Sequence, residues 1–359
     1  DNGTNLTLTG NTNDWQSIYW GDGFYVLVDP VNNNYVYAEY QYGNFAKSTN
    51  GGNSFNTAMN GISSSDRKNW CTPVVFDPTN PEILYYGANR LYKSTNRASN
   101  WEAVSTDLTN GPGLNLVFGT ISTISVSPVN PEIIYVGTDD GNVWVRAMNG
   151  MGWEYLSLNL PDRWVTRVAA DPVDENTAYV TFSGYRWDEY LPHIFRTIDK
   201  GQNWEDISGN LPEVPVNDVI VDPEDNNRLY IATDAGVFKT NDLGINWEMQ
   251  GSNLPNVPIN DLTLHSESRT LIAATFGRSI YTYDLNQDTL TTSIEERPVL
   301  FNTLNFDVFP NPFTDQFSIK VQSTIQNQGK IEICDLSGKT ILTIYRGIFV
   351  KGENHFNFG

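Results

Sequence analysis

One stretch of the sequence, residues 182–193, gathers side chains that could act on a carbohydrate. It offers aromatic faces on which a sugar ring can stack, a cation and two adjacent carboxylates, in the order Tyr185, Arg186, Trp187, Asp188 and Glu189. Hydrolysis of a glycosidic bond needs two carboxyl groups about 5 to 9.5 Å apart, one of them acting as general acid. We therefore take the two carboxylates as candidate catalytic residues and the other three as candidate ligand-binding residues. The alternative is a packed segment that shields neighbouring structure.

A second stretch, residues 19–24, places Asp22 between two glycines and after Trp20. Asp22 is a further candidate for general acid or base, with Asp188 or Glu189 as its partner. The alternative is that Asp22 belongs to an Asp-Gly turn without chemistry. Trp20 joins the candidate ligand-binding residues. Three more candidates, taken from other presumed loops, are Tyr42, Trp70 and Arg278.

The composition limits which chemistry is available to these residues. The chain has 359 residues and a net charge of -20, which argues against nucleic acid and anionic lipid as partners. Its three histidines and two cysteines lie far apart, which argues against a zinc site or a Ser-His-Asp triad. No apolar run reaches the ~18 residues of a membrane-spanning helix. We expect no metal and no cofactor, so catalysis would rest on carboxylates, Tyr or Arg.

The chain repeats itself at intervals of roughly 40–50 residues, the range of four-stranded propeller blades. Each repeat has a short apolar run, an Asp-Pro turn, a Tyr-rich run, a Gly turn and a third apolar run. Such β-branched and aromatic runs, bounded by turn residues, predict β-strands. The Asp-Pro turns are Asp29-Pro30, Asp77-Pro78, Asp171-Pro172 and Asp222-Pro223. The sequence therefore predicts an all-β fold that must position the candidate residues on its loops.

The turn after the third run has the form Ser/Thr-x-Asp/Asn-x-Gly-x-x-Trp/Phe. Asp or Asn binds backbone amides in a turn, Gly permits a positive φ, and Trp packs back against the hairpin. Clear copies span residues 48–55, 94–101, 197–204 and 240–247, with Ala98 replacing Gly in the second. This pattern resembles the Asp box of sialidase-like, sortilin-like and xyloglucanase-like β-propellers, and the resemblance covers about residues 1–284. It implies that the box residues are scaffold.

The same resemblance directs attention to the loops at the mouth of the central channel. Residues 19–24 loosely resemble the Gly-Asp-x-Gly-Gly-Phe turn that carries an acidic catalytic residue in xyloglucanase-type propellers. A sialidase would need three converging Arg and a Tyr nucleophile, and few Arg lie on the relevant loops. A xyloglucanase-like enzyme often uses a cleft between two propellers, whereas one propeller is seen here. Binding without catalysis is therefore favoured slightly, and whether the chain is an enzyme is left open.

Six repeats can be aligned, and the last, residues 260–284, lacks the box. Residues 1–3 match residues 139–141, so the chain opens in the middle of a blade. One interpretation is that this N-terminal piece completes the last blade and closes a six-bladed ring. The other, which we favour at this stage, is that the propeller is a fragment of a larger one with further blades upstream.

The C-terminal part has a different pattern. Pro310-Asn311-Pro312-Phe313 precedes an alternating run at residues 317–321 and then Ile-x-Ile-x-Asp-x-x-Gly-Lys at residues 331–339. This order resembles the type A C-terminal sorting domain of type IX secretion. The resemblance implies an immunoglobulin-like β-sandwich, truncated here, that the export machinery recognises. It also implies a protein secreted by, or held on the outer surface of, a Gram-negative bacterium.

These observations predict three segments: a β-propeller at residues 1–285, a linker at 286–305 and the sorting domain at 306–359. The predicted function is a secreted or cell-surface propeller that binds a glycan or a protein ligand at its channel-mouth loops. The alternative is a glycoside hydrolase of xyloglucanase-like type that uses paired carboxylates. The expected partners are an extracellular glycan or surface protein and the type IX machinery, with neither nucleic acid nor membrane insertion.

Overall fold

The computed structural model describes residues 3–11, 13–113, 116–146, 152–251, 254–290, 305–309, 317–323, 326–334 and 340–358. The chain divides into two compact units, Asp1–Thr289 and Leu290–Gly359.

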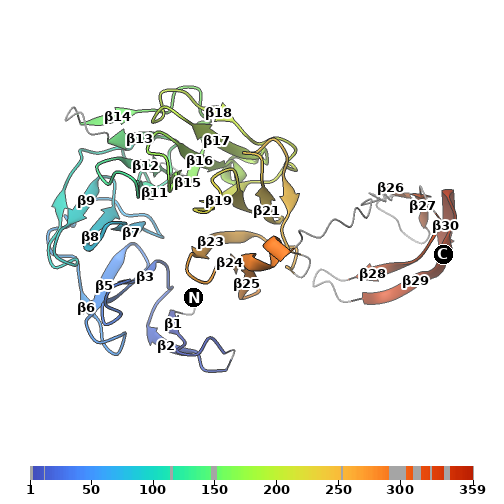
Figure 1. Ribbon diagram of the computed structural model, residues 1–359, viewed down its shortest axis with the longest axis horizontal. Helices are drawn as coiled ribbons and strands as arrows, with labels where there is room; N and C mark the ends of the chain where they lie inside the picture. The colour runs from blue at the N-terminus through green and yellow to red at the C-terminus, as the bar shows by residue number, and fades with distance from the viewer. Residues whose placement is uncertain are drawn as a thin grey trace. The chain divides into compact units, whose positions relative to one another are not determined.

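The first unit is a β-propeller, whose antiparallel sheets follow one another around a centre (Figure 1). Blades 1 and 2 consist of β3 (Val26–Val28), β4 (Val36–Tyr40), β5 (Asn44–Ser48) and β6 (Asn56–Thr57), then β7 (Val74–Asp77), β8 (Asn80–Gly87), β9 (Leu91–Ser94) and β10 (Glu102–Ala103). Blades 3 and 4 consist of β11 (Ile121–Val126), β12 (Ile134–Thr138), β13 (Val143–Arg146) and β14 (Trp153–Tyr155), then β15 (Trp164–Ala170), β16 (Ala178–Ser183), β17 (His193–Thr197) and β18 (Glu205–Asp206).

Blade 5 consists of β19 (Val216–Val221), β20 (Leu229–Thr233), β21 (Gly236–Thr240) and β22 (Glu248–Met249). Blade 6 has three strands in the described residues, β23 (Ile259–His265), β24 (Thr270–Thr275) and β25 (Ile280–Asp284). The predicted propeller is thus confirmed, with one difference. In the part of the chain that the structure describes, blade 6 has no fourth strand, consistent with the absence of the turn motif from its sequence.

The N-terminal piece forms a two-stranded sheet of its own. β1 (Thr4–Leu6) pairs with β2 (Gln16–Tyr19), while β25 pairs with β24. One interpretation of the sequence required the N-terminal piece to complete blade 6. Within the described residues, β1 and β2 pair with each other and do not join the sheet of blade 6.

The turns between the first and second strands form as their sequences predict. Asp29 is buried, and its Oδ1 accepts hydrogen bonds from the backbone N–H groups of Val31 (2.9 Å) and Asn32 (3.0 Å). Such a side-chain cap satisfies amides that the strands leave unpaired. The same kind of cap recurs at Asp77, Asp171 and Asp222. The sequence therefore dictates where each first hairpin closes.

The turns between the third and fourth strands share one hydrogen-bond pattern. Thr197 Oγ1 accepts from the N–H of Gly201 (2.8 Å), and Asp199 Oδ1 accepts from the N–H of Asn203 (2.9 Å). The pattern recurs in the turns that begin at Ser48, Ser94 and Thr240. Ala98 takes the Gly position of the second copy at φ +57°, which costs a non-glycine residue about 1–2 kcal/mol. The hydrogen bonds of the turn outweigh that cost.

The hydrophobic core lies between the blades. In the described residues, each of the five junctions between consecutive blades holds its own cluster of buried side chains. The second strand of each complete blade contributes a Tyr with at most 1% of its surface exposed, namely Tyr37, Tyr85, Tyr135, Tyr179 and Tyr230. Burial of these large rings is the main driving force that holds successive sheets together.

The second unit contains two sheets. One consists of β26 (Asn305–Phe309), β27 (Phe317–Ser323) and β30 (Gly352–Phe358), and the other of β28 (Asn327–Cys334) and β29 (Thr340–Phe349). Ile319 and Val321 of one sheet pack with Phe349 of the other, which is the arrangement of a small β-sandwich domain. The Pro310-Asn311-Pro312-Phe313 segment and residues 335–339 of the sequence motif lie outside the described residues.

Across the described residues, the structure contains no helix with the length and apolar character needed to cross a membrane.

Candidate functional site

Loops from separate parts of each blade meet at one end of it. Because neighbouring strands are antiparallel, the loop that leads into the first strand lies at the same end as the loop between the second and third strands. We call this end the loop face. In blade 1 it comprises residues 20–25 and 41–43, and the loop of residues 58–73, which leads into blade 2, adjoins it. These loops carry Trp20, Asp22, Tyr42 and Trp70, four of the predicted site residues.

Asp22 is partly exposed in a tight bend of the loop face. Its Oδ2 accepts a hydrogen bond from Nε2 of Gln41 (2.8 Å). The preceding Gly21 has φ +98°, and a Cβ there would stand 2.7 Å from Cβ of Tyr40. Only glycine therefore lets the bend approach the end of β4 this closely. Gly21 and Asp22 favour the bend by themselves. The hydrogen bond to Gln41 forms because the pairing of β3 with β4 brings the turn after β4 beside the bend.

Three aromatic side chains of these loops expose part of their surface. Trp20 is 80% exposed, Tyr42 51% and Trp70 38%. The Tyr42 and Trp70 rings meet edge to face at 4.8 Å, and the Tyr42 N–H donates to the Trp70 carbonyl (3.0 Å). Phe24 supports Trp70 from the other side at 6.0 Å. The arrangement offers rigid aromatic faces to solvent, of the kind that sugar rings stack on.

An open groove continues from Tyr42 along the outer side of blade 1. Polar and apolar side chains line it together, namely Tyr42, Asn44, Thr57, Met59, Ile62, Ser64, Asp66 and Lys68. Lys68 Nζ donates to the Asp66 carbonyl oxygen (3.0 Å), and burial lowers the pKa of Lys68. The groove thus combines hydrogen-bonding groups with an aromatic end.

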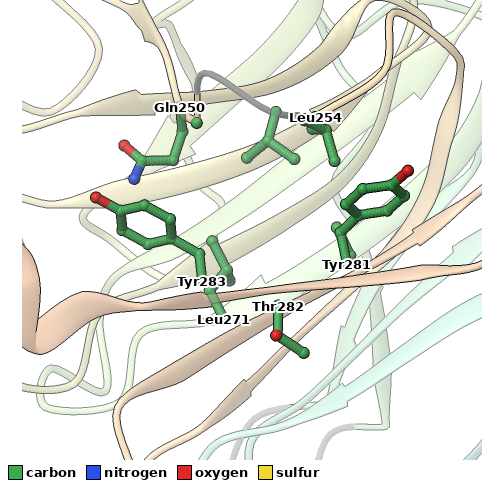
Figure 2. A pocket seen from close by; sticks show the side chains of 9 residues that line it. Gln250, Leu254, Leu271, Tyr281, Thr282 and Tyr283 are labelled. Atoms are coloured by element: carbon green, nitrogen blue, oxygen red, sulfur yellow. The ribbon is translucent and has the colours of Figure 1, made fainter. Parts of the chain in front are cut away.

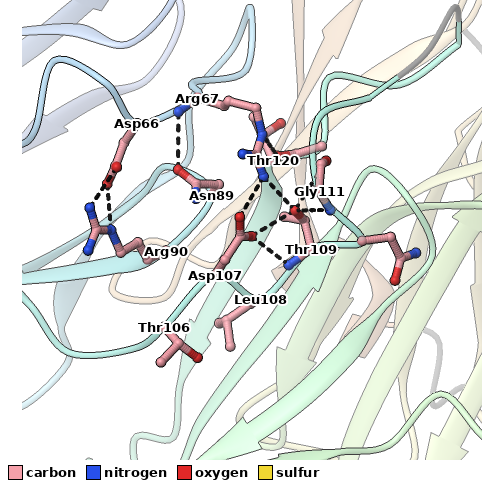
Figure 3. A network of polar contacts seen from close by, with 12 residues as sticks. Asp66, Arg67, Asn89, Arg90, Thr106, Asp107, Leu108, Thr109, Gly111 and Thr120 are labelled. Atoms are coloured by element: carbon pink, nitrogen blue, oxygen red, sulfur yellow. Dashed lines mark hydrogen bonds and ion pairs between the residues drawn. The ribbon is translucent and has the colours of Figure 1, made fainter.

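A polar network holds the loop that forms one wall of this groove (Figure 3). Arg90 makes two 2.7 Å bonds to the Asp66 carboxylate, and Tyr92 donates a further short bond to it. Burial raises the pKa of Asp66, but the bonds from Arg90 and Tyr92 outweigh it and leave the pKa below its usual range. Arg67 bonds to Asp107 (2.8 Å) in the loop that leads into blade 3. Asp66 is therefore an ionised structural anchor.

The candidate loop of residues 182–193 lies on blade 4 and packs towards blade 3. Tyr185–Trp187 forms the 3₁₀ turn η1. Arg186 donates to the Leu116 carbonyl (2.7 Å) and lies 4.3 Å from the centre of the Trp164 ring. Arg163 lies 5.7 Å from the centre of the Trp187 ring. Arg186 and Trp187 therefore have structural partners, as the packed-segment alternative expects, while Tyr185 is 65% exposed.

The two carboxylates of this loop differ in their partners. Glu189 accepts from Arg163 (2.9 Å) and contacts His193 (2.8 Å). Burial raises the pKa of Glu189, but His193 and Arg163 outweigh it and lower the pKa overall. A lowered pKa makes a carboxyl group a poor general acid at neutral pH. Asp188 accepts from Tyr190 (2.8 Å).

The structure places the candidate carboxylates on two different blades. Asp22 stands on blade 1 and Asp188 and Glu189 stand on blade 4, and these blades lie on opposite sides of the ring (Figure 1). Arg278 is exposed in the turn between β24 and β25 of blade 6. The predicted residues therefore form one cluster on blade 1, a second group on blade 4 and a separate cation.

Sequence reasoning missed a charged group on the first strands of the blades. Arg167 of β15 bonds to both oxygens of Asp218 on β19 (2.5 and 2.7 Å) and to Asp261 on β23 (2.5 Å). Burial raises the pKa of Asp218, and the adjacent guanidinium opposes this rise. Tyr25, Arg167 and Asp218 each lie four residues before the Asp of an Asp-Pro turn. This shared spacing could have shown from the sequence that they occupy equivalent positions in their blades.

Glu39 is a second group that the sequence did not single out. It is fully buried on β4, and its Oε1 accepts from the backbone N–H of Thr72 (3.1 Å). Its Oε2 has no hydrogen-bond partner among the described residues. Burial raises the pKa of Glu39 well above its usual value, which favours the neutral carboxylic acid. In the part of the chain that the structure describes, no three His, Cys, Asp or Glu residues cluster as metal ligands would.

Comparison with curated proteins finds xyloglucanases. A segment of 82 residues, 20% of this chain, is 34% identical to a xyloglucanase of Acetivibrio thermocellus, of which it covers 10%. A segment of 149 residues, 38% of this chain, is 29% identical to a probable oligoxyloglucan-reducing end-specific xyloglucanase of Neosartorya fischeri, of which it covers 17%. The matched segments are thus small parts of these relatives.

Solved structures include the same class of enzyme. A GH74 xyloglucanase from Xanthomonas campestris matches with a TM-score of 0.58 and 17% identity, over 75% of this chain and 45% of that one. A GH74 enzyme from Niastella koreensis matches with a TM-score of 0.56 and 19% identity, over 84% of this chain and 50% of that one. At this identity the likeness establishes the propeller fold. The chain spans about half the length of each structure.

The C-terminal unit matches a known family. Residues 307–355 fit the model of the secretion system C-terminal sorting domain. This domain marks proteins that the type IX system exports to the medium or to the cell surface. The predicted location is therefore confirmed: the chain carries the sorting domain of a protein that is secreted, or displayed on the outer surface, by a Gram-negative bacterium.

Proposed function

We propose that the propeller binds a β-glucan of the xyloglucan class at the loop face of blade 1. The observation that carries the proposal is the exposure of Trp20, Tyr42 and Trp70 on the loops that also carry Asp22, next to an open groove that Tyr42 helps to line. Pyranose rings present apolar C–H faces and a rim of hydroxyls, so they suit aromatic platforms flanked by hydrogen-bonding groups. The likeness to xyloglucanases supports this choice of polysaccharide over a protein ligand.

Binding without hydrolysis fits the geometry of the candidate carboxylates. Asp22 is held by Gln41 on blade 1, while Glu189 is tied to Arg163 and His193 on blade 4. Glycosidases need two carboxyl groups within about 10 Å of each other, and one of them must carry a proton at working pH.

The proposal is tested by measuring binding of a xyloglucan oligosaccharide by calorimetry, with dextran as the control glycan. The face of Trp20, if it covers about 60 Å² of a sugar at about 25 cal/mol/Å², contributes about 1.5 kcal/mol. Trp20→Ala is therefore expected to weaken binding roughly tenfold. The matched control is Tyr155→Ala, which removes an aromatic side chain that is 56% exposed on β14. Equal affinity of wild type and Trp20→Ala would refute the site.

Glycoside hydrolysis is the second candidate, and the likeness to xyloglucanases favours it. Reducing-sugar release from xyloglucan separates the two functions in one assay. Under the binding proposal, wild type binds without release, and Asp22→Asn keeps its affinity within about threefold because the amide oxygen still accepts from Gln41. Release by wild type that Asp22→Asn abolishes would instead establish hydrolysis, with Asp22 as a catalytic residue.

A further inference from the structure

At four junctions between consecutive blades, an indole of the later blade binds to the earlier blade. In each case the Trp of the turn after the third strand donates its Nε1–H to a backbone carbonyl of the preceding blade. The bonds are Trp101 to Ala58 (2.8 Å), Trp153 to Val104 (3.2 Å), Trp204 to Leu156 (3.2 Å) and Trp247 to Ile207 (2.9 Å). Junctions 1/2, 2/3, 3/4 and 4/5 are thus closed in one way.

The residue that supplies the accepting carbonyl occupies the same place in every complete blade. It follows the fourth strand, and its N–H donates back to the third strand, as in Ile207 to Ile194 (3.0 Å). In blade 5 the corresponding bond is Gln250 to Val237 (2.8 Å). Gln250 is therefore the fifth member of the series. Within the described residues, no indole reaches its carbonyl.

A pocket lies where the fifth indole would be. It has a volume of about 160 Å³ and is lined by Val237, Gln250, Gly251, Leu254, Leu271, Ala273, Tyr281, Thr282 and Tyr283. Figure 2 shows Tyr281 and Tyr283 on either side of the opening, with Gln250 and Leu254 across from them. An apolar cavity of about 150 Å³ is known to accept a benzene ring. We call this pocket the indole socket.

The residues that line the socket are equivalent to residues that pack around the indole in the other junctions. At junction 4/5, Trp247 shares a buried cluster with Ile194 and Ile231. The strand registers equate Ile194 with Val237 and Ile231 with Ala273. The socket has the smaller side chain at both positions, and therefore has room for a ring.

β25 lines one side of the socket. β25 pairs with β24 on one side, and in the described residues no strand lies on its other side. In every complete blade a short fourth strand occupies that edge. A free strand edge offers alternate N–H and C=O groups to an added strand. The socket and the edge thus continue the interface that joins the other blades.

We propose that blade 6 binds an extended, Trp-bearing segment of a different protein, which adds a fourth strand to β25 and inserts its indole in the socket. The indole N–H donates to the Gln250 carbonyl, as its counterparts do in the four earlier junctions. The tyrosines at the opening pack against the ring. This site is separate from the loop face of blade 1 and does not depend on the function proposed there.

The test uses a labelled peptide that copies residues 240–250 of this chain, which span the turn after β21 with Trp247 and the fourth strand of blade 5. A second peptide has Ala in place of that Trp. Fluorescence anisotropy is expected to show saturable binding of the first peptide to the full chain, and at least tenfold weaker binding of the second. Free indole is expected to compete with the first peptide.

Two variants test the location of the site. Ala273→Phe fills the socket from inside, and Tyr281→Ala removes one wall; each is expected to weaken binding at least fivefold, whereas Tyr155→Ala leaves it unchanged. Equal binding of the two peptides, or wild-type binding by both variants, would overturn the proposal. So would a concentration-dependent dimer that the peptide dissociates, because the occupant would then be a second copy of this chain.

Discussion

Removal of the indole at the junction between blades 1 and 2 is expected to destabilise the propeller strongly. Trp101 is 2% exposed, its ring lies near Tyr86 (5.8 Å) and Phe45 (6.1 Å), and its Nε1–H donates to the Ala58 carbonyl (2.8 Å). Burial of about 200 Å² at about 25 cal/mol/Å² corresponds to about 5 kcal/mol. Trp→Ala changes in cores cost about 3–5 kcal/mol, and the Ala58 carbonyl also loses its partner. Trp101→Ala should therefore lower the free energy of unfolding by about 4–5 kcal/mol.

Urea unfolding followed by far-UV circular dichroism measures this loss without relying on tryptophan fluorescence. Trp101→Phe keeps a ring but removes the N–H donor, so we expect it to cost about 1–2 kcal/mol. Trp20→Ala is the control, because that side chain is 80% exposed and its removal should change stability by less than about 0.5 kcal/mol.

A loss below about 2 kcal/mol for Trp101→Ala would refute the reasoning. So would equal losses for Trp101→Ala and Trp101→Phe, because the ring would then contribute nothing beyond its hydrogen bond. Either result would also remove the support that the occupied junctions lend to the indole socket.

Three further predictions concern pH, backbone strain and thiol reactivity. Asp222 is fully buried and accepts two 2.7 Å hydrogen bonds from Arg269. Burial raises the pKa of Asp222, but the bonds from Arg269 outweigh this effect and leave the pKa below its usual value. The stability that Asp222 contributes is therefore present above about pH 4 and is lost as the pH falls towards the folded-state pKa. Urea unfolding at pH 7 and pH 3 should show a lower free energy of unfolding at pH 3. Arg269→Ala should lower the free energy of unfolding by about 3–5 kcal/mol at pH 7 and reduce its difference between the two pH values. Gly43→Ala should lower the free energy of unfolding by at least about 2 kcal/mol, because Gly43 has φ +65° and its new Cβ would stand 2.1 Å from the hydroxyl of the buried Tyr86. An unchanged midpoint of thermal unfolding would contradict this prediction. Burial raises the pKa of the Cys71 thiol, so in a Cys334→Ser background iodoacetamide should label the native protein far more slowly at pH 8 than the urea-unfolded chain.

The candidate site was only partly predictable from sequence. The aromatic and acidic residues of blade 1 were named individually, and the structure brings Asp22, Tyr42 and Trp70 onto one loop face. That Asp22 meets Gln41 depends on how β4 turns into β5, which no local pattern specifies. Glu189 was named as a catalytic candidate because it stands beside Asp188 in a loop rich in aromatic residues, and no local pattern shows which side chain will bind it. Arg163, 26 residues away in the chain, binds it.

The sequence by itself determined the blade: where strands run, where Asp caps the first turn, and where Gly and Asp shape the third. These features depend on contacts within a few residues, so residue type and spacing suffice to encode them. Only the tertiary structure decided which side chains meet across blades. Arg167 contacts Asp218 and Asp261, which lie in the two following blades. Among the described residues no fourth strand follows β25, and the indole socket lies open beside it. Such pairings depend on how the blades are arranged around the ring, because contacts between distant segments form only when whole sheets have packed against one another.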